Sequence, residues 1–467
     1  MALWALGLFV GLSAGFAGST GADEPEVTDS YRFETLGNSY RFAADGSSTV
    51  RVDAEIRVLG SAAIQQLGQL YFPYAGDISR LEVHYIRVVK PDGRELEASR
   101  DLFKDLDAPV PGGFPIYSNL RLLHVTAPPF EVGDRLHYLV DVHFDPLEVP
   151  GPLSVLHDFE RTGVDREVLT VDIPTEIEVV HRSLFEPQIE DLESHRRYTW
   201  IFEASGDEPA PGDGADGADG GLEAREAVDV ELSTAKSWAE VGAWFRSLAE
   251  GRDAPGPELR RLVEERLEGV EDPRGKIEVL HRLVTTEIRY LSLLLERGRY
   301  LPRFAQEVLE SGFGDCKDKH ALLSALLRAA GFETAGVLVN LSQPPALGVP
   351  TQLHFNHIIT RVELEDGPVW LDSTAVAPAG YLAPALRGAR GLLVPATGEP
   401  RLVEMPEELL SGSSLALTRT ARVDDDGTLN GDDVLRVRGD YEVLTRAAML
   451  TMDSDQWRQM APAFAGG

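Results

Sequence analysis

Cys316 is the only thiol in this 467-residue chain, and its surroundings could make it a nucleophile. It follows a turn signal, and apolar residues recur after it at helical spacing until Gly331, which is typical of a helix end. We therefore expect Cys316 in the first turn of a helix, with Asp315 as N-cap and Asp318 as its capping-box partner. The partial positive charge and free N–H groups of a helix N-terminus favour a thiolate and could stabilise an oxyanion.

The alternative interpretation of Cys316 is structural, because most lone cysteines pack as small apolar residues. A strand-like run around His357 and a short strand that ends at Asp372 favour chemistry instead. The turn signal at residues 365–367 predicts that these strands form a hairpin, which could place His357 beside Asp372. A thiol nucleophile needs a base, and the base needs an acceptor that fixes its tautomer. Cys316, His357 and Asp372 supply these three roles in order.

Two other histidines are rival bases. His320 lies one helical turn after Cys316. His354 lies three residues before His357, which predicts that it points to the opposite face of the strand. We prefer His357 as the base because Asp372 can orient it.

Three short motifs around these residues resemble the transglutaminase-like superfamily of papain-type cysteine enzymes. They are Gly-Asp-Cys-Lys-Asp-Lys at 314–319, Phe-Asn-His-Ile-Ile at 355–359 and Trp-Leu-Asp-Ser-Thr at 370–374. Two upstream segments, at 288–292 and 302–309, also match the pattern of that superfamily.

The resemblance covers roughly residues 230–395 and implies a papain-like α+β core. It implies that Cys316 is the nucleophile, His357 the base and Asp372 its orienter. It also suggests that Tyr290 could donate a hydrogen bond to the oxyanion, as a polar group just upstream does in related folds. A packed tyrosine is the competing interpretation of Tyr290.

Residues 30–203 are rich in strand patterns. Apolar and polar residues alternate between turn signals, which predicts an antiparallel β-sandwich. The predicted strands lie at 49–58, 81–89, 135–142, 168–173, 177–182 and 197–202. The same residues resemble a β-rich domain of uncharacterised function that precedes the core in one exported bacterial group of the superfamily. Its histidines lack metal-ligand spacing, so we expect a binding or spacer role.

Composition predicts the other boundaries. Residues 1–22 are apolar and end in small residues, which is typical of an export signal, with an uncleaved membrane anchor as the alternative. Residues 204–226 have little apolar bulk, which indicates an acidic linker rather than a calcium loop. The predicted order is a signal at 1–22, a β-rich N-terminal domain at 23–203, the linker at 204–226, the transglutaminase-like core at 227–395, and the start of a C-terminal β region at 396–467. The fold class is α+β.

The formal net charge of −32 argues against nucleic acid or an anionic membrane surface as partner, because both need basic patches. We expect a periplasmic or secreted cysteine enzyme that acts on a peptide or protein substrate without a metal or cofactor. Hydrolysis is favoured over acyl transfer to an amine because water is always available. The alternatives are a non-catalytic binding scaffold of the cell envelope and, ranked last, a metal-dependent hydrolase.

Overall fold

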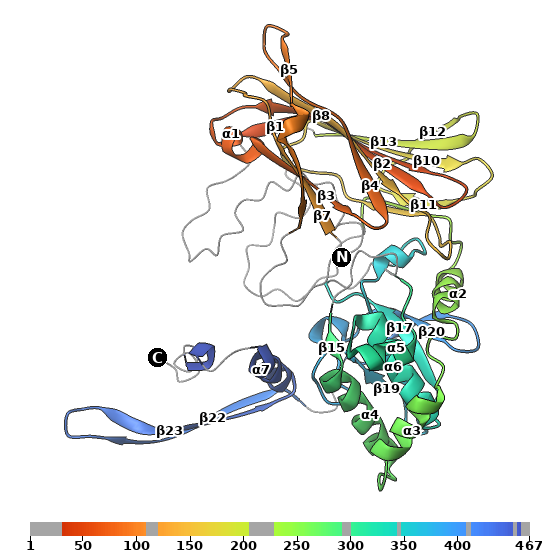
Figure 1. Cartoon of the computed structure of the whole chain (residues 1–467), viewed down its shortest axis with the longest axis vertical. Helices are drawn as coiled ribbons and strands as arrows, with labels where there is room; N and C mark the ends of the chain where they lie inside the picture. The colour runs from red at the N-terminus through yellow and green to blue at the C-terminus, as the bar shows by residue number, and fades with distance from the viewer. Residues whose placement is uncertain are drawn as a thin grey trace.

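The computed structural model describes residues 30–108, 120–204, 228–291, 300–342, 347–407, 412–451 and 455–458. It shows a β-rich region, an α+β core below it, and a hairpin that extends to one side (Figure 1). The predicted export signal at 1–22 and residues 205–226 of the predicted linker lie outside the described residues.

The β-rich region is built on an eight-stranded sheet in the order β12-β13-β10-β1-β2-β8-β4-β5. Its strands are β1 (Tyr31–Phe42), β2 (Ser48–Val58), β4 (Ser79–Val89), β5 (Glu95–Glu97), β8 (Arg135–Phe144), β10 (Arg166–Pro174), β12 (Gln188–Asp191) and β13 (His195–Glu203). In β2, buried residues from Val50 to Val58 alternate with outward-facing ones, as the sequence pattern predicts. Neighbouring strands are antiparallel except β1 and β10, which pair in parallel.

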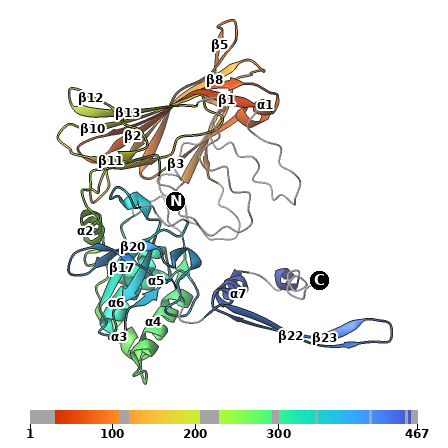
Figure 2. The same cartoon turned by 180° about the vertical axis from the view of Figure 1, so that it is seen from behind.

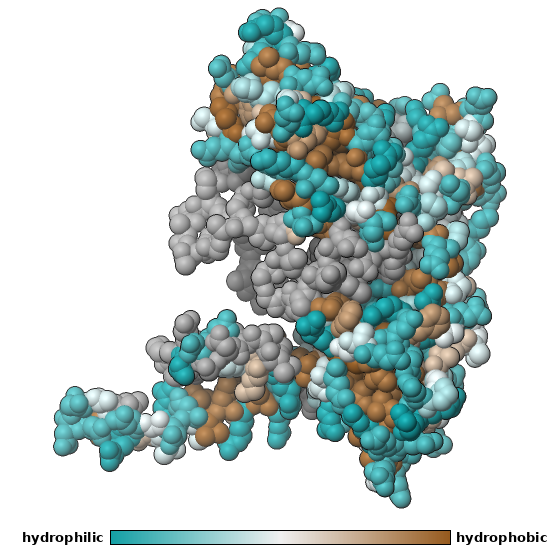
Figure 3. Space-filling view, viewed as in Figure 1, coloured by the Kyte–Doolittle hydropathy of each residue, from teal (hydrophilic) through white to brown (hydrophobic). Residues whose placement is uncertain are grey.

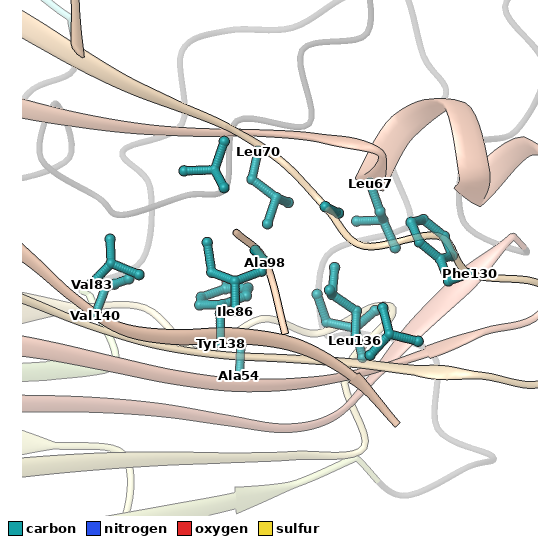
Figure 4. Packing of buried hydrophobic residues seen from close by; sticks show 14 of the residues in the cluster. Ala54, Leu67, Leu70, Val83, Ile86, Ala98, Phe130, Leu136, Tyr138 and Val140 are labelled. Atoms are coloured by element: carbon teal, nitrogen blue, oxygen red, sulfur yellow. The ribbon is translucent and has the colours of Figure 1, made fainter. Parts of the chain in front are cut away.

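A second layer covers one end of this sheet. It consists of α1 (Ala62–Leu67), the short helix η3 (Arg100–Leu102) and a sheet of β3 (Gln69–Ala75), β7 (Leu120–Thr126) and β6 (Phe103–Asp107). Side chains such as Leu67, Leu70 and Tyr138 are buried between the two layers (Figure 4). Removal of this apolar surface from water holds the layers together.

A third sheet packs near the other end of the large sheet. Its strands are β11 (Val180–Ser183), β14 (Val230–Ser233) and β9 (Ser154–His157), in that order. Leu232 of β14 is buried in a cluster that includes Trp200 of the large sheet. The β-rich region is therefore a sandwich that extends past the predicted linker to Ser233. The strand expected at 177–182 lies at Val180–Ser183.

Five helices precede or cross the core sheet. They are α2 (Trp238–Ala249), α3 (Pro257–Arg266), α4 (Pro273–Glu287), α5 (Ala305–Ser311) and α6 (Cys316–Ala329). The first three starts have local causes: the Ser237 side chain caps α2, the Asp272 side chain caps α4, and proline is the first residue of α3 and α4. Gly331, with a φ of 91°, follows the end of α6 as predicted.

The core sheet has the order β19-β18-β17-β20-β21. Its strands are β17 (Thr334–Val339), β18 (His357–Val362), β19 (Val369–Leu371), β20 (Arg390–Pro395) and β21 (Arg401–Glu404). The short pair β15 (Arg289–Tyr290) and β16 (Phe313–Gly314) and the short helices η4 (Gln352–His354) and η5 (Pro384–Leu386) complete it. Leu322 and Leu326 of α6 are fully buried among α3, α4 and the sheet, so α6 is the central helix of the core. The sheet continues to Glu404, beyond the predicted core boundary at 395.

A hairpin and a helix follow the core. They are β22 (Ser414–Val423), β23 (Leu429–Arg438) and α7 (Asp440–Thr451). The hairpin points away from the rest of the protein in both views (Figures 1 and 2), and every residue of β22 is exposed. Apolar side chains are visible along this element in the space-filling view (Figure 3). Across the described residues, no helix combines the length and apolar character needed to span a bilayer.

Candidate active site

Cys316 is the first residue of α6 and is partly exposed. Asp315 is the N-cap, and its Oδ1 accepts a hydrogen bond from the backbone N–H of Asp318 at 3.2 Å. The expected capping box is not completed. The carboxylate of Asp318 instead accepts from the backbone N–H and Nε of Arg303, at 2.8 and 2.9 Å. A guanidinium makes a stronger, charge-assisted bond than a second backbone amide would.

Lys317 lies beside the cysteine and is buried. Its Nζ donates to the carboxylate of Asp315, which is buried as well. Burial lowers the pKa of Lys317, but the negative charges of Asp315, Asp318 and Cys316 outweigh burial and raise it overall. Burial raises the pKa of Asp315, with Lys317 acting in the opposite direction. An ammonium group is therefore held next to the thiol.

His357 is the first residue of β18, and Asp372 follows the last residue of β19. The antiparallel register pairs Thr360 with Leu371. When this register is extended along β18 by three residues, to His357, Asp372 lies diagonally across from it on the same face of the sheet. The imidazole Nε2 lies 3.1 Å from Asp372 Oδ2, and both side chains are buried.

The electrostatics of this pair are mutual. Burial lowers the pKa of His357, but the charge and hydrogen bond of Asp372 and a hydrogen bond with Cys316 raise it to about 10. Burial raises the pKa of Asp372, but His357 and the hydrogen bonds from Thr374 lower it overall. Because Asp372 occupies Nε2, Nδ1 is the ring nitrogen left for Cys316. The structure thus brings the three predicted residues into one series, in which His357 is hydrogen-bonded to Asp372 and lies close enough to Cys316 for the thiol to raise its pKa.

Two further buried residues support this series, and the sequence analysis did not single them out. Nε2 of His281 on α4 lies 3.1 Å from the backbone carbonyl of Asp372. Because burial lowers the pKa of His281, the ring is neutral when it donates this hydrogen bond. Lys319 of α6 donates from Nζ to the carbonyl of Ile288 at 2.7 Å. Burial lowers the pKa of Lys319 to about 8, against the attraction of Asp372. The sequence signal that could have identified Lys319 is the presence of a charged residue on an otherwise apolar helix face.

The rival histidines have other partners. His320 Nδ1 lies 2.7 Å from the Thr360 hydroxyl, and burial lowers its pKa to about 3. His354 belongs to η4 rather than to the strand, so the expected opposite strand face was wrong. Its ring packs on Trp238 at 5.8 Å between centroids.

Tyr290 lies on β15, where it pairs in parallel with Gly314. The backbone N–H of Leu291 donates to the Gly314 carbonyl at 3.0 Å, which fixes β15 beside the residues that precede Cys316. The oxyanion role of Tyr290 stays a prediction. Among the residues that the structure describes, no group of three or more His, Cys, Asp or Glu side chains could hold a metal ion.

Comparisons with known proteins agree with this architecture. Residues 260–372 match the model of the transglutaminase-like superfamily, and residues 44–205 match the model of DUF3857, a domain of unknown function with a solved structure. Among functionally curated proteins, no sequence match is found.

Among solved structures, a candidate protease from Parabacteroides distasonis is similar over most of the chain. The TM-score is 0.66 at 16% sequence identity, and the match covers 82% of this chain and 72% of that one. At this identity the likeness shows the fold alone. A candidate cysteine protease from Cytophaga hutchinsonii is 10% identical over 87% of this chain and 92% of that one, but its TM-score of 0.23 is too low to indicate a shared fold. The chain thus combines an N-terminal DUF3857 domain with a core of the transglutaminase-like superfamily.

Proposed function

We propose that this chain is an exported cysteine enzyme that cleaves or transfers acyl groups at peptide or protein amide bonds. The observation that supports this proposal most strongly is the position of His357. Its ring is hydrogen-bonded to Asp372, and both Asp372 and the neighbouring Cys316 raise its pKa. A buried imidazole with a carboxylate and a thiol as partners is the arrangement that thiol acyl transfer requires.

The raised pKa of His357, about 10, defines the resting state in this proposal. At neutral pH the ring is protonated, and an imidazolium beside the thiol favours the thiolate, which is the nucleophilic form. Asp372 stabilises the ring cation from the other side, and Lys317 adds a second positive charge near the sulfur.

The reaction follows from these positions. The Cys316 thiolate attacks the amide carbonyl, and the carbonyl π electrons move to oxygen to form a tetrahedral oxyanion. N–H groups at the start of α6, and the hydroxyl of Tyr290, are the proposed oxyanion donors. The imidazolium of His357 gives its proton to the leaving amine as the C–N bond breaks, which leaves a thioester. His357 then removes a proton from water or from an acceptor amine as that group attacks the thioester carbonyl. The C–S bond breaks, the acyl product leaves, and the Cys316 thiolate and the His357 imidazolium are restored.

Hydrolysis is the favoured second half-reaction, because water needs no binding site of its own. An acceptor amine would make the enzyme a cross-linker through the same thioester. A periplasmic or secreted location is part of the proposal and rests on the sequence of residues 1–22.

The test is the rate of Cys316 alkylation by iodoacetamide as a function of pH. We expect fast alkylation at about pH 6, well below the ordinary thiol pKa of about 8.5, and loss of that reactivity in His357→Gln. Because Cys316 is the only thiol in the chain, all alkylation reports on this site.

A second measurement addresses acyl transfer directly. After brief exposure to an activated ester such as p-nitrophenyl acetate, mass spectrometry should find an acetyl group on Cys316 of the wild type. The Cys316→Ala variant is the control and should carry none. A thiol that reacts only above about pH 8 and ignores His357→Gln would favour the non-catalytic scaffold.

A further inference from the structure

The chain segment that leads into His357 lies against the sandwich rather than only against its own core. In Figures 1 and 2 this segment, cyan and near residue 350, lies between β11 of the sandwich and the core sheet. The segment, residues 347–356, includes η4 and ends directly before the proposed base.

Glu231 of β14 makes the closest contact with this segment. Its side chain is fully buried, and Oε2 accepts a hydrogen bond from the backbone N–H of Val349 at 2.7 Å. Oε1 accepts from Arg182 of β11 at 3.0 Å and lies 3.9 Å from Nε2 of His354. One carboxylate of the sandwich thus bridges a sandwich arginine and the segment before His357.

The approach at Gly348 is so close that a side chain there would displace Glu231 and Arg182. A Cβ at this position would lie 2.1 Å from Glu231 Oε2 and 2.8 Å from the Arg182 guanidinium carbon. The backbone of the segment is therefore pressed directly onto the ion pair, and glycine is the residue that permits this distance.

Gln352 of η4 provides a second contact with the sandwich. Its Nε2 donates to the carbonyl of Pro152 at 3.1 Å, and its Oε1 accepts from the hydroxyl of Ser154 on β9 at 3.4 Å. Glu231 and Gln352 therefore fix the segment at two points, through strands β14 and β9.

The fixed segment continues into the site without a free hinge. Asn340 Nδ2 donates to the carbonyl of His354 at 3.0 Å, and the backbone N–H of Asn356 donates to the carbonyl of Val339 at 3.0 Å. Phe355 packs edge-on against Trp238 at 5.8 Å. A shift at Val349 or Gln352 would therefore be passed along a continuous backbone to His357.

We infer that the sandwich is a positioning element for the catalytic base, and that the positioning residues are Glu231 on the sandwich side of the contact and Gln352 on the core side. They hold residues 347–356 in the conformation that places the His357 ring between Asp372 and Cys316. This inference rests on the proposed function and assigns the sandwich a role in the same site.

The experiment compares alkylation of Cys316 by iodoacetamide between pH 5 and 9 in the full-length wild type and in variants of the contact. In Glu231→Ala we expect alkylation at pH 6 to slow by about tenfold or more, since small displacements of reacting groups have effects of this order. Glu231→Gln keeps an acceptor for the Val349 N–H but loses the charge that Arg182 binds, so it should restore part of the rate.

Two variants perturb the contact without burying an unpaired charge. Gly348→Ala changes the contact from the core side. Gln352→Leu removes the contacts with Pro152 and Ser154, together with the hydrogen bond that Gln352 Oε1 accepts from the Thr351 hydroxyl. Both should shift the pH profile in the direction of Glu231→Ala. They keep the inference testable if the Glu231 variants do not fold.

The matched control is Asp172→Asn. Asp172 is also a buried sandwich carboxylate, and it binds Arg197 at 2.7 and 2.8 Å, but its partner lies on β13, away from the core segment. We expect Asp172→Asn to leave the alkylation profile unchanged. Hydrogen exchange of residues 347–356 should rise in the Glu231 variants and not in this control.

The outcomes separate the two proposals. If His357→Gln leaves the alkylation rate of Cys316 at the wild-type value, the proposed function is wrong. If the wild type depends on His357 but folded Glu231→Ala, Gly348→Ala and Gln352→Leu all match Asp172→Asn, the positioning inference is wrong and the proposed function stands.

Discussion

The core and the sandwich both pair histidines with carboxylates, but the pairs differ in their surroundings. In the core, the His357 and Asp372 side chains are 3% and 7% exposed. In the sandwich, His84 lies 2.9 Å from Asp141 with a side chain 31% exposed, and His137 lies 2.8 Å from Asp53. These two sandwich pairs have arginine and tyrosine neighbours, whereas His357 faces a thiol. His157 and Glu167 of the sandwich lie 2.9 Å apart with side chains 11% and 1% exposed, so distance and burial together do not mark a site either; the thiol as third partner does.

The largest effect should come from Asp372→Ala in the core. Without the carboxylate, the His357 cation loses its buried counter-charge and its orientation, so the thiolate loses its partner. We expect acetylation of Cys316 by the activated ester to slow by on the order of 10³-fold, measured by intact mass over time. An Asp372→Ala protein that reacts at the wild-type rate would remove the distinction between the core pair and the sandwich pairs.

The second effect is a pH dependence of stability carried by His357. Its pKa is raised from 6.5 to about 10 in the folded state, so its stabilising contribution is complete below about pH 6.5 and is lost as pH rises through about 10. The difference in unfolding free energy between wild type and His357→Gln should fall by at most about 1.4 kcal/mol per pH unit in this window.

Chemical denaturation of the two proteins between pH 6 and 10 measures this difference. Lys319, with a pKa lowered to about 8, acts with the opposite sign from about pH 8 to 10.5, but it is present in both proteins. Asp372 contributes at lower pH, because its pKa is lowered and its stabilisation disappears only on acidification. A constant difference across the window would show that His357 is not charged in the folded core.

A smaller effect is expected from Arg303→Lys. Arg303 donates from Nε to Asp318, and its guanidinium lies 4.7 Å from the centre of the Phe313 ring, a geometry that an ammonium does not reproduce. We expect a loss of about 1–3 kcal/mol in stability, measured by denaturant titration, because Asp318 would be left buried with fewer partners. The matched control is Arg266→Lys, whose partner Glu287 is half exposed, and it should cost less.

The smallest effect should come from the sandwich. His84→Gln should change stability by less than about 1 kcal/mol, since the pair is partly solvated, and should leave alkylation of Cys316 unchanged. A marked loss of thiol reactivity in this variant would contradict the contrast between the two regions.

Local signals in the sequence predicted the elements that carry the candidate site. These signals depend on residues that lie close together in the chain, so they can be recognised from the sequence alone. They are the N-cap at Asp315, the helix stop at Gly331 and the turn before Asp372. The partner of the Asp318 carboxylate could not be predicted in this way, because Arg303 contacts it from a separate segment of the chain.

Long-range pairing accounts for most of what the sequence did not predict. The parallel contact of β1 with β10 joins strands more than a hundred residues apart, and β14 returns to the sandwich after the predicted linker. Periodicity reports which face of a strand is buried but not which strand lies beside it. The contact of Glu231 with Val349 has the same origin, since nothing near either residue identifies the other.

The return of β14 has a consequence for dissecting the protein. Because β14 lies between β9 and β11, a cut introduced between Glu203 and Asp229 would separate a strand from the sheet it completes. The two fragments should remain bound to each other and elute together from a sizing column. A sandwich fragment that ends at Glu203 lacks β14 and would have an open strand position between β9 and β11, so the two parts are better studied as one polypeptide.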